Sequence, residues 1–234
     1  MKNTLLFPVE KWDFGTRDML KVLTADEYEY LIGRQQVQQY KKGEIVFREG
    51  HISSGFFFIR AGKVKKYKTD KDGREHIIYI AREKEFIGYH AVLAEERYPD
   101  SASTLENCQL CFIPQEDFFL VLKNSPLLNA KLIKTLSHEF TVLSNNLSIS
   151  SQRTAIERLA IALLFLNEKY NYNPHEPHNP ILLSRRDLAN IVGLAQENII
   201  RLLKELKDEG AIRIEGKEIW IDNESILIGR TNYF

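Results

Sequence analysis

The most specific pattern in the chain is residues 183–212, LSRRDLANIVGLAQENIIRLLKELKDEGAI. If Arg185 is the first residue of a helix-turn-helix, the small Ala189 falls fifth, where the two helices approach closely. Gly193 falls ninth, in the tight turn that favours a positive φ, and Ile199 falls fifteenth, in the junction. The remaining apolar positions are filled by Leu188, Val192, Leu194 and Leu202. Together these positions predict two helices joined by a tight turn.

The ends of this segment carry boundary signals. Ser184, with Asp187 three residues later, resembles a capping box and predicts the start of the first helix. Gly210 is typical of a position just after a helix C-terminus. Residues 211–214 and 218–221 flank a Glu-Gly-Lys turn and predict a hairpin. The unit is therefore expected to be a winged helix-turn-helix.

One face of the second predicted helix is left to solvent. Its members are Gln196, Glu197, Ile200, Arg201 and Lys204. In a helix-turn-helix this face enters the major groove of DNA. Arginine suits the paired acceptors of guanine, glutamate accepts from the cytosine amino group, and glutamine suits adenine. The alternative, a surface ion pair between Glu197 and Arg201, is worth only a few tenths of a kcal/mol.

Two further arginines, at the start of the first helix, can reach phosphates. The residues expected to contact DNA are therefore Arg185, Arg186, Gln196, Glu197, Arg201 and Lys204.

Charge limits how such a unit could bind. The chain carries 32 Lys+Arg and 32 Asp+Glu, so its formal net charge of zero excludes binding by bulk positive charge. Residues 184–207 hold five basic and three acidic residues, but residues 153–234 hold 11 basic and 12 acidic ones. One copy alone should bind DNA weakly, and two copies are expected to act together.

An apolar stripe upstream offers a way to pair two copies. Residues spaced by three and four, as in a coiled-coil seam, are Ile133, Leu136, Phe140, Leu143 and Leu147. The other face is polar and includes His138 and Glu139. A dimer seam and packing of the helix on its own domain both account for the stripe. The serines at 148–152 predict a break and a hinge before the next helix, residues 154–170.

The first half of the chain has a different texture. Short segments rich in Ile, Val, Phe and Tyr alternate with glycine turns, which predicts an antiparallel sandwich or small barrel. The clearest segments are residues 44–47, 56–60, 63–68, 76–80 and 109–113. A partly helical lead-in is expected over residues 1–33, with a helix start at Thr24.

Several other classes of function lack support in the sequence. The longest apolar stretch, residues 159–166, is far short of the ~20 residues that span a bilayer, and the N-terminal apolar segment is too short for a secretory signal. Two cysteines and no export signal predict a cytoplasmic protein. No catalytic constellation stands out, so no enzymatic activity is expected.

Cys108 and Cys111 form a CxxC, but metal sites and iron–sulfur clusters normally need four ligands, and there is no other cysteine. Residues three apart in a strand face opposite sides, so ordinary barrel residues are the first interpretation and a redox pair is the alternative. No metal and no cofactor are predicted.

The order barrel, long helix, winged helix-turn-helix resembles the cyclic-AMP receptor protein/FNR (CRP/FNR) family of bacterial transcription regulators. The resemblance implies an α+β fold: a cyclic-nucleotide-binding-type β-roll (a double-stranded β-helix, or jelly roll), a long dimerisation helix and a winged helix-turn-helix. The expected domains are an effector domain over 1–125, a dimerisation helix and hinge over 126–152 and a DNA-binding domain over 153–234. Residues 41–67, KKGEIVFREGHISSGFFFIRAGKVKKY, resemble the family's roll, with glycines at 43, 50 and 62.

The DNA-reading positions follow the family with one departure. Glu197 and Arg201 occupy the positions of the family's base-contacting Glu and Arg. Gln196 replaces the Arg that precedes this Glu in the cyclic-AMP-responsive branch, which implies an altered half-site.

The effector cassette departs further. In FIGYHAVLAEERYPDSAST (86–104), Gly88 is kept, but Tyr89 stands where the family places the ribose-binding Glu, and Asp100 where it places the phosphate-binding Arg. A carboxylate repels a phosphate diester that an Arg would bind, so cyclic AMP is not expected to be the effector. The effector pocket that the resemblance implies comprises Gly88, Tyr89, His90, Asp100, Ser101, Leu143 and Ser144.

The resemblance implies a homodimeric, sequence-specific transcription regulator on a palindromic operator, gated by an unknown small effector other than cyclic AMP. Its implied partners are double-stranded DNA and a second copy, with RNA polymerase as a further candidate and no membrane. The alternative is a small-ligand, redox or haem sensor, using His90 or the cysteines, whose helix-turn-helix contacts protein.

Overall fold

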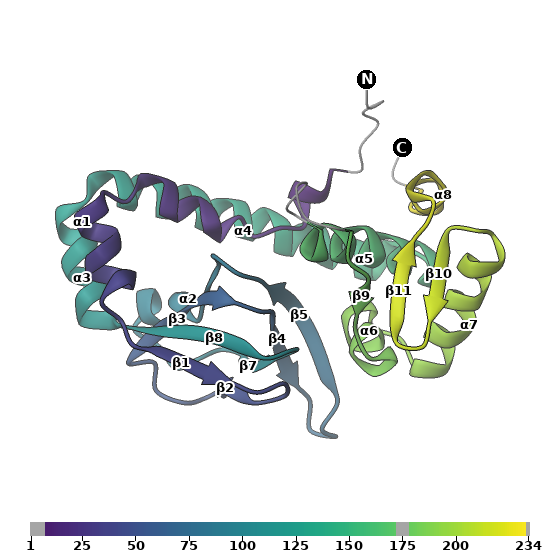
Figure 1. Cartoon of the computed structure of the whole chain (residues 1–234), viewed down its shortest axis with the longest axis horizontal. Coiled ribbons are helices and arrows are strands. Elements are labelled where there is room, and N and C mark those ends of the chain that lie inside the picture. Colours follow the sequence, from purple (N-terminus) through teal and green to yellow (C-terminus); the bar gives the residue numbers. More distant parts are fainter. Residues whose placement is uncertain (1–7, 172–177, 233–234) are drawn as a thin grey trace. The chain divides into compact units, whose positions relative to one another are not determined.

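A computed structural model describes residues 8–171 and 178–232 (Figure 1). The chain divides into two compact units, one of residues 14–140 and the other of residues 1–13 together with 141–234. No helix within the described residues is both long and apolar enough to cross a bilayer.

The first unit is built around two four-stranded antiparallel sheets. One sheet has the order β1-β8-β3-β6 and the other β2-β7-β4-β5. The strands are β1 (Val37–Tyr40), β2 (Ile45–Phe47), β3 (Gly55–Ala61), β4 (Val64–Thr69), β5 (Glu75–Ala81), β6 (Phe86–Ile87), β7 (Ser101–Thr104) and β8 (Cys108–Pro114). The five strands expected from the apolar alternation are confirmed, and the two sheets form the predicted β-roll.

Three of these strands were not expected. β1 is mostly polar, β6 has two residues, and β7 is a run of Ser, Ala and Thr. None carries the apolar alternation that marks a half-buried strand. They form because neighbouring strands pair with them, as β8 does with β1 and β4 with β7.

Helices cover one side of the roll. They are η2 (Thr16–Val22), α1 (Ala25–Tyr28), η3 (Glu29–Gly33), α2 (Tyr89–Ala94), α3 (Gln115–Asn124) and the first part of α4. Thr24 caps α1 through a capping box with Glu27, as the sequence predicts. The core between these helices and the roll is rich in aromatic rings, with Phe118 meeting Phe56 edge-on at a centroid separation of 4.7 Å.

The long helix α4 is continuous from Pro126 to Gln152. The break expected within residues 148–152 is wrong, because the serines remain helical. Ser151 donates a hydrogen bond to the carbonyl of Leu147 one turn back, which satisfies its hydroxyl inside the helix. The helix ends before Thr154, which begins the next helix with a capping box.

The second unit contains the winged helix-turn-helix. Its elements are η1 (Val9–Lys11), α5 (Ala155–Tyr170), β9 (Ile181–Leu182), α6 (Arg185–Val192), α7 (Gln196–Asp208), β10 (Ile212–Glu215), β11 (Glu218–Ile221) and α8 (Glu224–Arg230). The strands form a sheet of order β10-β11-β9, and α5 packs against α6, α7 and α8. The predicted fold class, an α+β chain with a roll, a long helix and a winged helix-turn-helix, is confirmed.

Candidate nucleic-acid interface and effector site

The turn between α6 and α7 forms for the reasons that the sequence predicts. The Ser184 hydroxyl accepts a hydrogen bond from the backbone N–H of Asp187 and so caps α6. Gly193 ends α6 with φ +70°, a conformation that side chains with a Cβ rarely adopt. The carbonyl of the buried Ala189 accepts hydrogen bonds from the backbone N–H groups of Gly193 and Leu194. These bonds fix where α7 begins.

α7 divides cleanly into a buried and an exposed face. The buried side chains are Ile199, Leu202, Leu203 and Leu206. The side chains expected to face solvent are all exposed: Gln196, Glu197, Ile200, Arg201 and Lys204. We call these five residues the reading face. A helix that buries one apolar stripe against its domain presents the opposite face to any partner.

The charged side chains of the reading face make few ion pairs with the part of the chain that the structure describes. Among the described residues Glu197 has no ion-pair partner, and Arg201 lies 3.9 Å from Glu205, one turn further on, with its side chain 66% exposed. Glu205 also lies 3.8 Å from Arg230. The alternative interpretation, a Glu197–Arg201 surface pair, is therefore not what the structure contains.

The two arginines at the start of α6 differ. Arg186 is exposed, whereas Arg185 is partly buried and donates a hydrogen bond from Nη2 to the carbonyl of Gly216, in the turn between β10 and β11 (3.3 Å). Burial lowers the pKa of Arg185 from its usual value. The structure thus uses Arg185 to join α6 to the wing, rather than leaving it free as an exposed cation.

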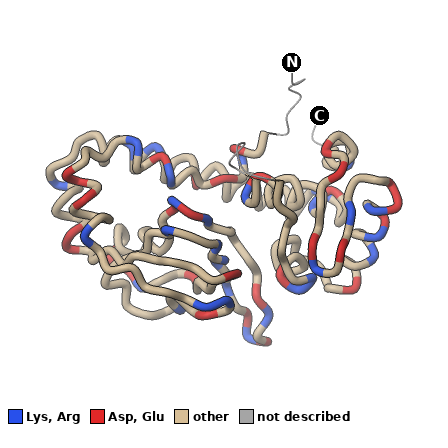
Figure 2. The backbone as a smooth tube through the Cα atoms, in the orientation of Figure 1, with Lys and Arg blue, Asp and Glu red and all other residues tan. Residues whose placement is uncertain are grey.

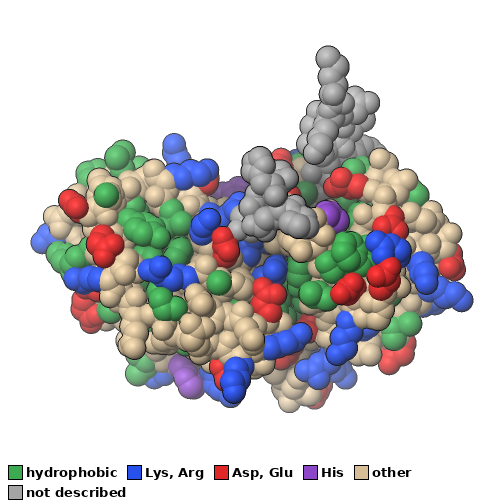
Figure 3. Space-filling view, in the orientation of Figure 1, with side chains coloured by type: hydrophobic (Ala, Val, Ile, Leu, Met, Phe, Trp, Pro, Cys, Tyr) green, Lys and Arg blue, Asp and Glu red, His purple; other side chains and the backbone are tan. Residues whose placement is uncertain are grey.

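Charge is mixed over both units. Figure 2 shows basic and acidic residues interspersed along α7, β10 and β11, and Figure 3 shows both signs scattered over the visible face. This agrees with the zero net charge of the chain. On the face that Figure 3 draws, the basic side chains do not form a continuous patch.

The cassette residues of the expected effector pocket turn toward α4. Gly88, with φ +85°, precedes α2, and the next two side chains both reach Glu139 of α4. The Tyr89 hydroxyl donates a hydrogen bond to one carboxylate oxygen of Glu139, and Nε2 of His90 contacts the other. Burial, followed by the nearby Glu139 carboxylate, raises the pKa of Tyr89 well above its usual value.

The sequence places Glu139 on the polar face of its helix, but the structure buries this residue. Its residue is 3% exposed, because the two partners on α2 satisfy the carboxylate away from water. The heptad pattern alone could not show this, since Glu139 neighbours the exposed Phe140 in sequence.

Aromatic rings fill the roll next to Gly88. Phe47 stacks on Tyr98 with centroids 4.2 Å apart and lies 6.0 Å from Phe57. The Tyr98 hydroxyl donates to the carbonyl of Gly55 at 2.5 Å, and burial raises its pKa to about 12. A Cβ on Gly88 would lie 3.0 Å from Tyr98 and 3.2 Å from Phe47, so the cassette backbone packs directly on these rings.

The remaining cassette residues are also engaged by the roll. Asp100, which replaces the phosphate-binding Arg, forms an ion pair with Lys66 at 3.1 Å, and both residues are 6% exposed. The Ser101 hydroxyl accepts a hydrogen bond from the backbone N–H of Glu49. Lys66 was not among the residues predicted from the sequence. Strand alternation places consecutive lysines on opposite faces, but both Lys65 and Lys66 are buried, so alternation alone does not identify the partner of Asp100.

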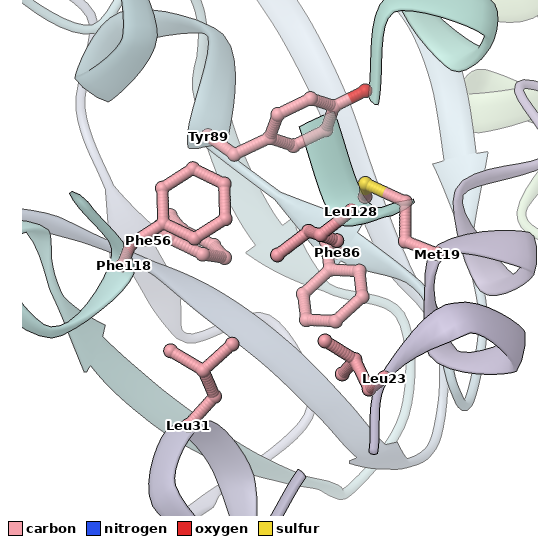
Figure 4. Close-up of a pocket in the computed structure, with 8 residues that line it drawn as sticks. All are labelled: Met19, Leu23, Leu31, Phe56, Phe86, Tyr89, Phe118 and Leu128. Atoms are coloured by element: carbon pink, nitrogen blue, oxygen red, sulfur yellow. The ribbon is translucent and has the colours of Figure 1, made fainter. Parts of the chain in front are cut away.

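A separate apolar pocket lies under α2, outside the expected effector site. Its lining comes from the N-terminal helical segment, the roll, α2, α3 and α4: Met19, Leu23, Leu31, Phe56, Phe86, Tyr89, Phe118 and Leu128 (Figure 4). The Tyr89 hydroxyl points away from it, toward α4. Of the expected pocket residues only Tyr89 lines this space. Leu143 and Ser144 are exposed on the part of α4 that belongs to the other unit.

The stripe on α4 is largely exposed. The exposed fractions of Ile133, Phe140 and Leu147 are 64%, 73% and 73%, and that of Leu143 is 44%. Leu136 differs, because it is partly buried against the core of the first unit. One residue of the stripe therefore packs on its own domain, and four remain exposed, so the dimer seam stays a prediction.

The two cysteines are buried in the roll and have different surroundings. Cys108 and Cys111 are both buried and unbridged, and burial raises the pKa of Cys108 to about 11. Arg60 donates from Nε to the Cys111 sulfur at 3.0 Å. The raised pKa of Cys108 disfavours the thiolate form of this residue. Among the described residues no group of three or more His, Cys, Asp or Glu side chains could hold a metal ion.

Comparisons with known proteins agree with this architecture. The family model of the cyclic nucleotide-binding domain matches residues 37–125, and that of the Crp-like helix-turn-helix domain matches residues 157–228. The chain is 30% identical over 182 residues to the transcriptional activator protein anr of Pseudomonas aeruginosa, covering 77% of this chain and 74% of that protein.

A second relative is the fumarate and nitrate reduction regulatory protein of Escherichia coli, 27% identical over 86% of this chain and 80% of its own length. The solved structure of FixK2 from Bradyrhizobium japonicum shares the fold, with a TM-score of 0.74, 19% identity, and coverage of 86% of this chain and 98% of that one. The chain therefore belongs to the CRP/FNR family of DNA-binding transcription regulators, which are not enzymes.

Proposed function

We propose that the protein is a homodimeric regulator that reads an inverted DNA repeat through two copies of the reading face. The observation that carries this proposal is that α7 leaves Gln196, Glu197 and Arg201 exposed while burying its apolar side. These three side chains can form hydrogen bonds with base edges in the major groove. Lys204 and the exposed Arg186 are the cations proposed to meet phosphates.

The second copy is proposed to cover the open stripe of α4, formed by Ile133, Phe140, Leu143 and Leu147. These side chains recur along one helix at heptad spacing, so a second identical helix can pack on them in the same way. Pairing would place two reading faces about 34 Å apart, one turn of B-DNA, on successive major grooves.

The effector of this regulator is proposed not to be cyclic AMP. Tyr89 and His90 contact Glu139, the roll next to Gly88 holds the rings of Phe47 and Tyr98, and Lys66 is paired with Asp100. A phosphate diester entering the roll would meet a carboxylate and would have to break this ion pair. Calorimetric titration with cyclic AMP should show no binding at micromolar concentrations.

The proposal is tested by selecting bound DNA from a random library with the full-length protein, with and without a panel of metabolites. An enriched palindrome is expected, and no enrichment under any condition would contradict DNA reading. Phe140→Asp should convert the dimer to a monomer in analytical ultracentrifugation and weaken operator binding roughly a hundredfold or more, since the second half-site then no longer binds intramolecularly.

The matched control is Leu127→Asp, which changes an equally exposed apolar residue (67%) of α4 outside the stripe. It should leave both the dimer and operator affinity unchanged. A dimer that survives Phe140→Asp would contradict the proposed seam without touching the reading face.

A further inference from the structure

One member of the reading face cannot form a hydrogen bond. In α7, all of whose residues the structure describes, Ile200 is 51% exposed, whereas Ile199, Leu202, Leu203 and Leu206 are at most 3% exposed. The other large apolar side chains of α7 are buried, so the half-exposed Ile200 is the exception. Covering its exposed surface with a partner would be favourable, because apolar surface would leave water.

The neighbours of Ile200 are the side chains proposed to meet DNA. On a helix, residues three and four apart lie side by side, so Ile200 is flanked by Gln196 and Glu197 on one side and by Lys204 on the other. All three are exposed, and Arg201 follows directly. Any surface that these polar groups approach must also meet the isoleucine.

We propose that Ile200 reads a thymine by packing on its 5-methyl group, an inference that rests on the proposed function. Thymine is the only base that presents an apolar group in the major groove. Any other base edge against Ile200 would be cut off from water without gaining a hydrogen bond, which costs free energy. The side chain therefore selects thymine both by the methyl group that it covers and by the edges that it disfavours.

The location of this thymine follows from the helix. Ile200 lies between Glu197 and Arg201 in the sequence, so the thymine falls within or directly beside the base pairs that these two residues read. Because two copies bind an inverted repeat, the same thymine appears once in each half-site at symmetric positions.

The test replaces thymines of the selected operator, one symmetric pair at a time, with deoxyuridine. This change removes the methyl group and keeps every hydrogen-bonding group of the base. For the wild-type protein one symmetric pair should weaken binding roughly tenfold to twentyfold, as expected when one methyl group in each of the two half-sites is no longer buried. With Ile200→Ser, the same replacement should have no effect.

The matched control is Leu182→Ser on β9, which removes another apolar side chain of similar exposure (45%) from the same unit. This variant should keep the wild-type response to deoxyuridine, and both variants should keep the wild-type unfolding temperature. The inference is overturned if every deoxyuridine replacement is neutral, if the half-site holds no thymine there, or if Ile200→Ser responds as the wild type does. A failure to enrich any DNA would instead overturn the proposed function, and this inference with it.

Discussion

The reading face of α7 and the interior of the β-roll differ in how their charged side chains are engaged. On α7, Glu197 has no ion-pair partner among the described residues, and Arg201 lies at 3.9 Å from a single-turn neighbour. In the roll, Lys66 and Asp100 neutralise each other at 3.1 Å while almost fully buried.

Exposed charges on α7 can interact with a partner, whereas the buried charges of the roll stabilise the fold by pairing with each other. A charge that remains in water can move to a partner at little cost, because it gives up only weak surface interactions. A buried pair can accept a charged ligand only by breaking, which leaves one charge unpaired in a poorly solvated place. The reading face of α7 is thus exposed to solvent, whereas the cassette residues are engaged by other side chains of the same chain.

The largest expected effect comes from Lys66→Met, which tests whether the buried ion pair stabilises the roll. It would leave Asp100 buried without its cation and should lower the free energy of unfolding by about 3–5 kcal/mol, measured by urea denaturation. The double variant Lys66→Met/Asp100→Leu removes both charges and should recover most of that stability.

A destabilisation below about 1 kcal/mol for Lys66→Met, the range of an exposed ion pair, would show that water or another cation reaches Asp100. The charged side chains of the roll would then be accessible to solvent ions, as those of the reading face are, and the two regions would no longer differ.

A region can be predicted from the sequence when its structure is determined by neighbouring residues and not by distant ones. The helix-turn-helix was predicted with its turn glycine, its cap and its exposed face, because local rules determine these features: Ser184 caps α6, and Gly193 adopts φ +70°. The strands with strong apolar alternation were predicted for the same reason. β7 was not, since its short Ser/Ala/Thr segment becomes a strand only by pairing with β2 and β4.

The side-chain pairings inside the first unit lay beyond sequence reasoning. Glu139 meets residues about 50 positions away, and Lys66 of β4 pairs with Asp100, which directly precedes the neighbouring strand β7. A charged residue is usually exposed, so its burial is visible only when its partner is brought beside it by the fold. The sequence did indicate that Tyr89 and Asp100 depart from a nucleotide cassette, but not what they bind instead.

Arg201→Ala tests whether the exposed arginine of the reading face reads a base. The operator affinity should fall by roughly 1–3 kcal/mol for each arginine that reads a base, with relaxed selectivity at one symmetric base pair, measured by binding titration and repeated selection. The control is Glu205→Gln, which removes the 3.9 Å ion pair but keeps the arginine. It should change affinity by only a few tenths of a kcal/mol. Equal effects for the two variants would mean that the ion pair, and not base reading, makes Arg201 important.

The smallest expected effect distinguishes the two arginines at the start of α6. Arg185→Ala removes a hydrogen bond to the carbonyl of Gly216 and should lower the free energy of unfolding by about 0.5–1.5 kcal/mol. Since Arg185 holds the wing rather than a phosphate, the dependence of operator affinity on salt concentration should stay as in the wild type. Arg186→Ala should do the reverse, leaving stability unchanged and reducing the slope of log K against log salt by about one for each phosphate that is no longer neutralised. If Arg185→Ala also reduces that slope, the bond to Gly216 opens on DNA, and Arg185 belongs with the residues kept available instead of those used for stability.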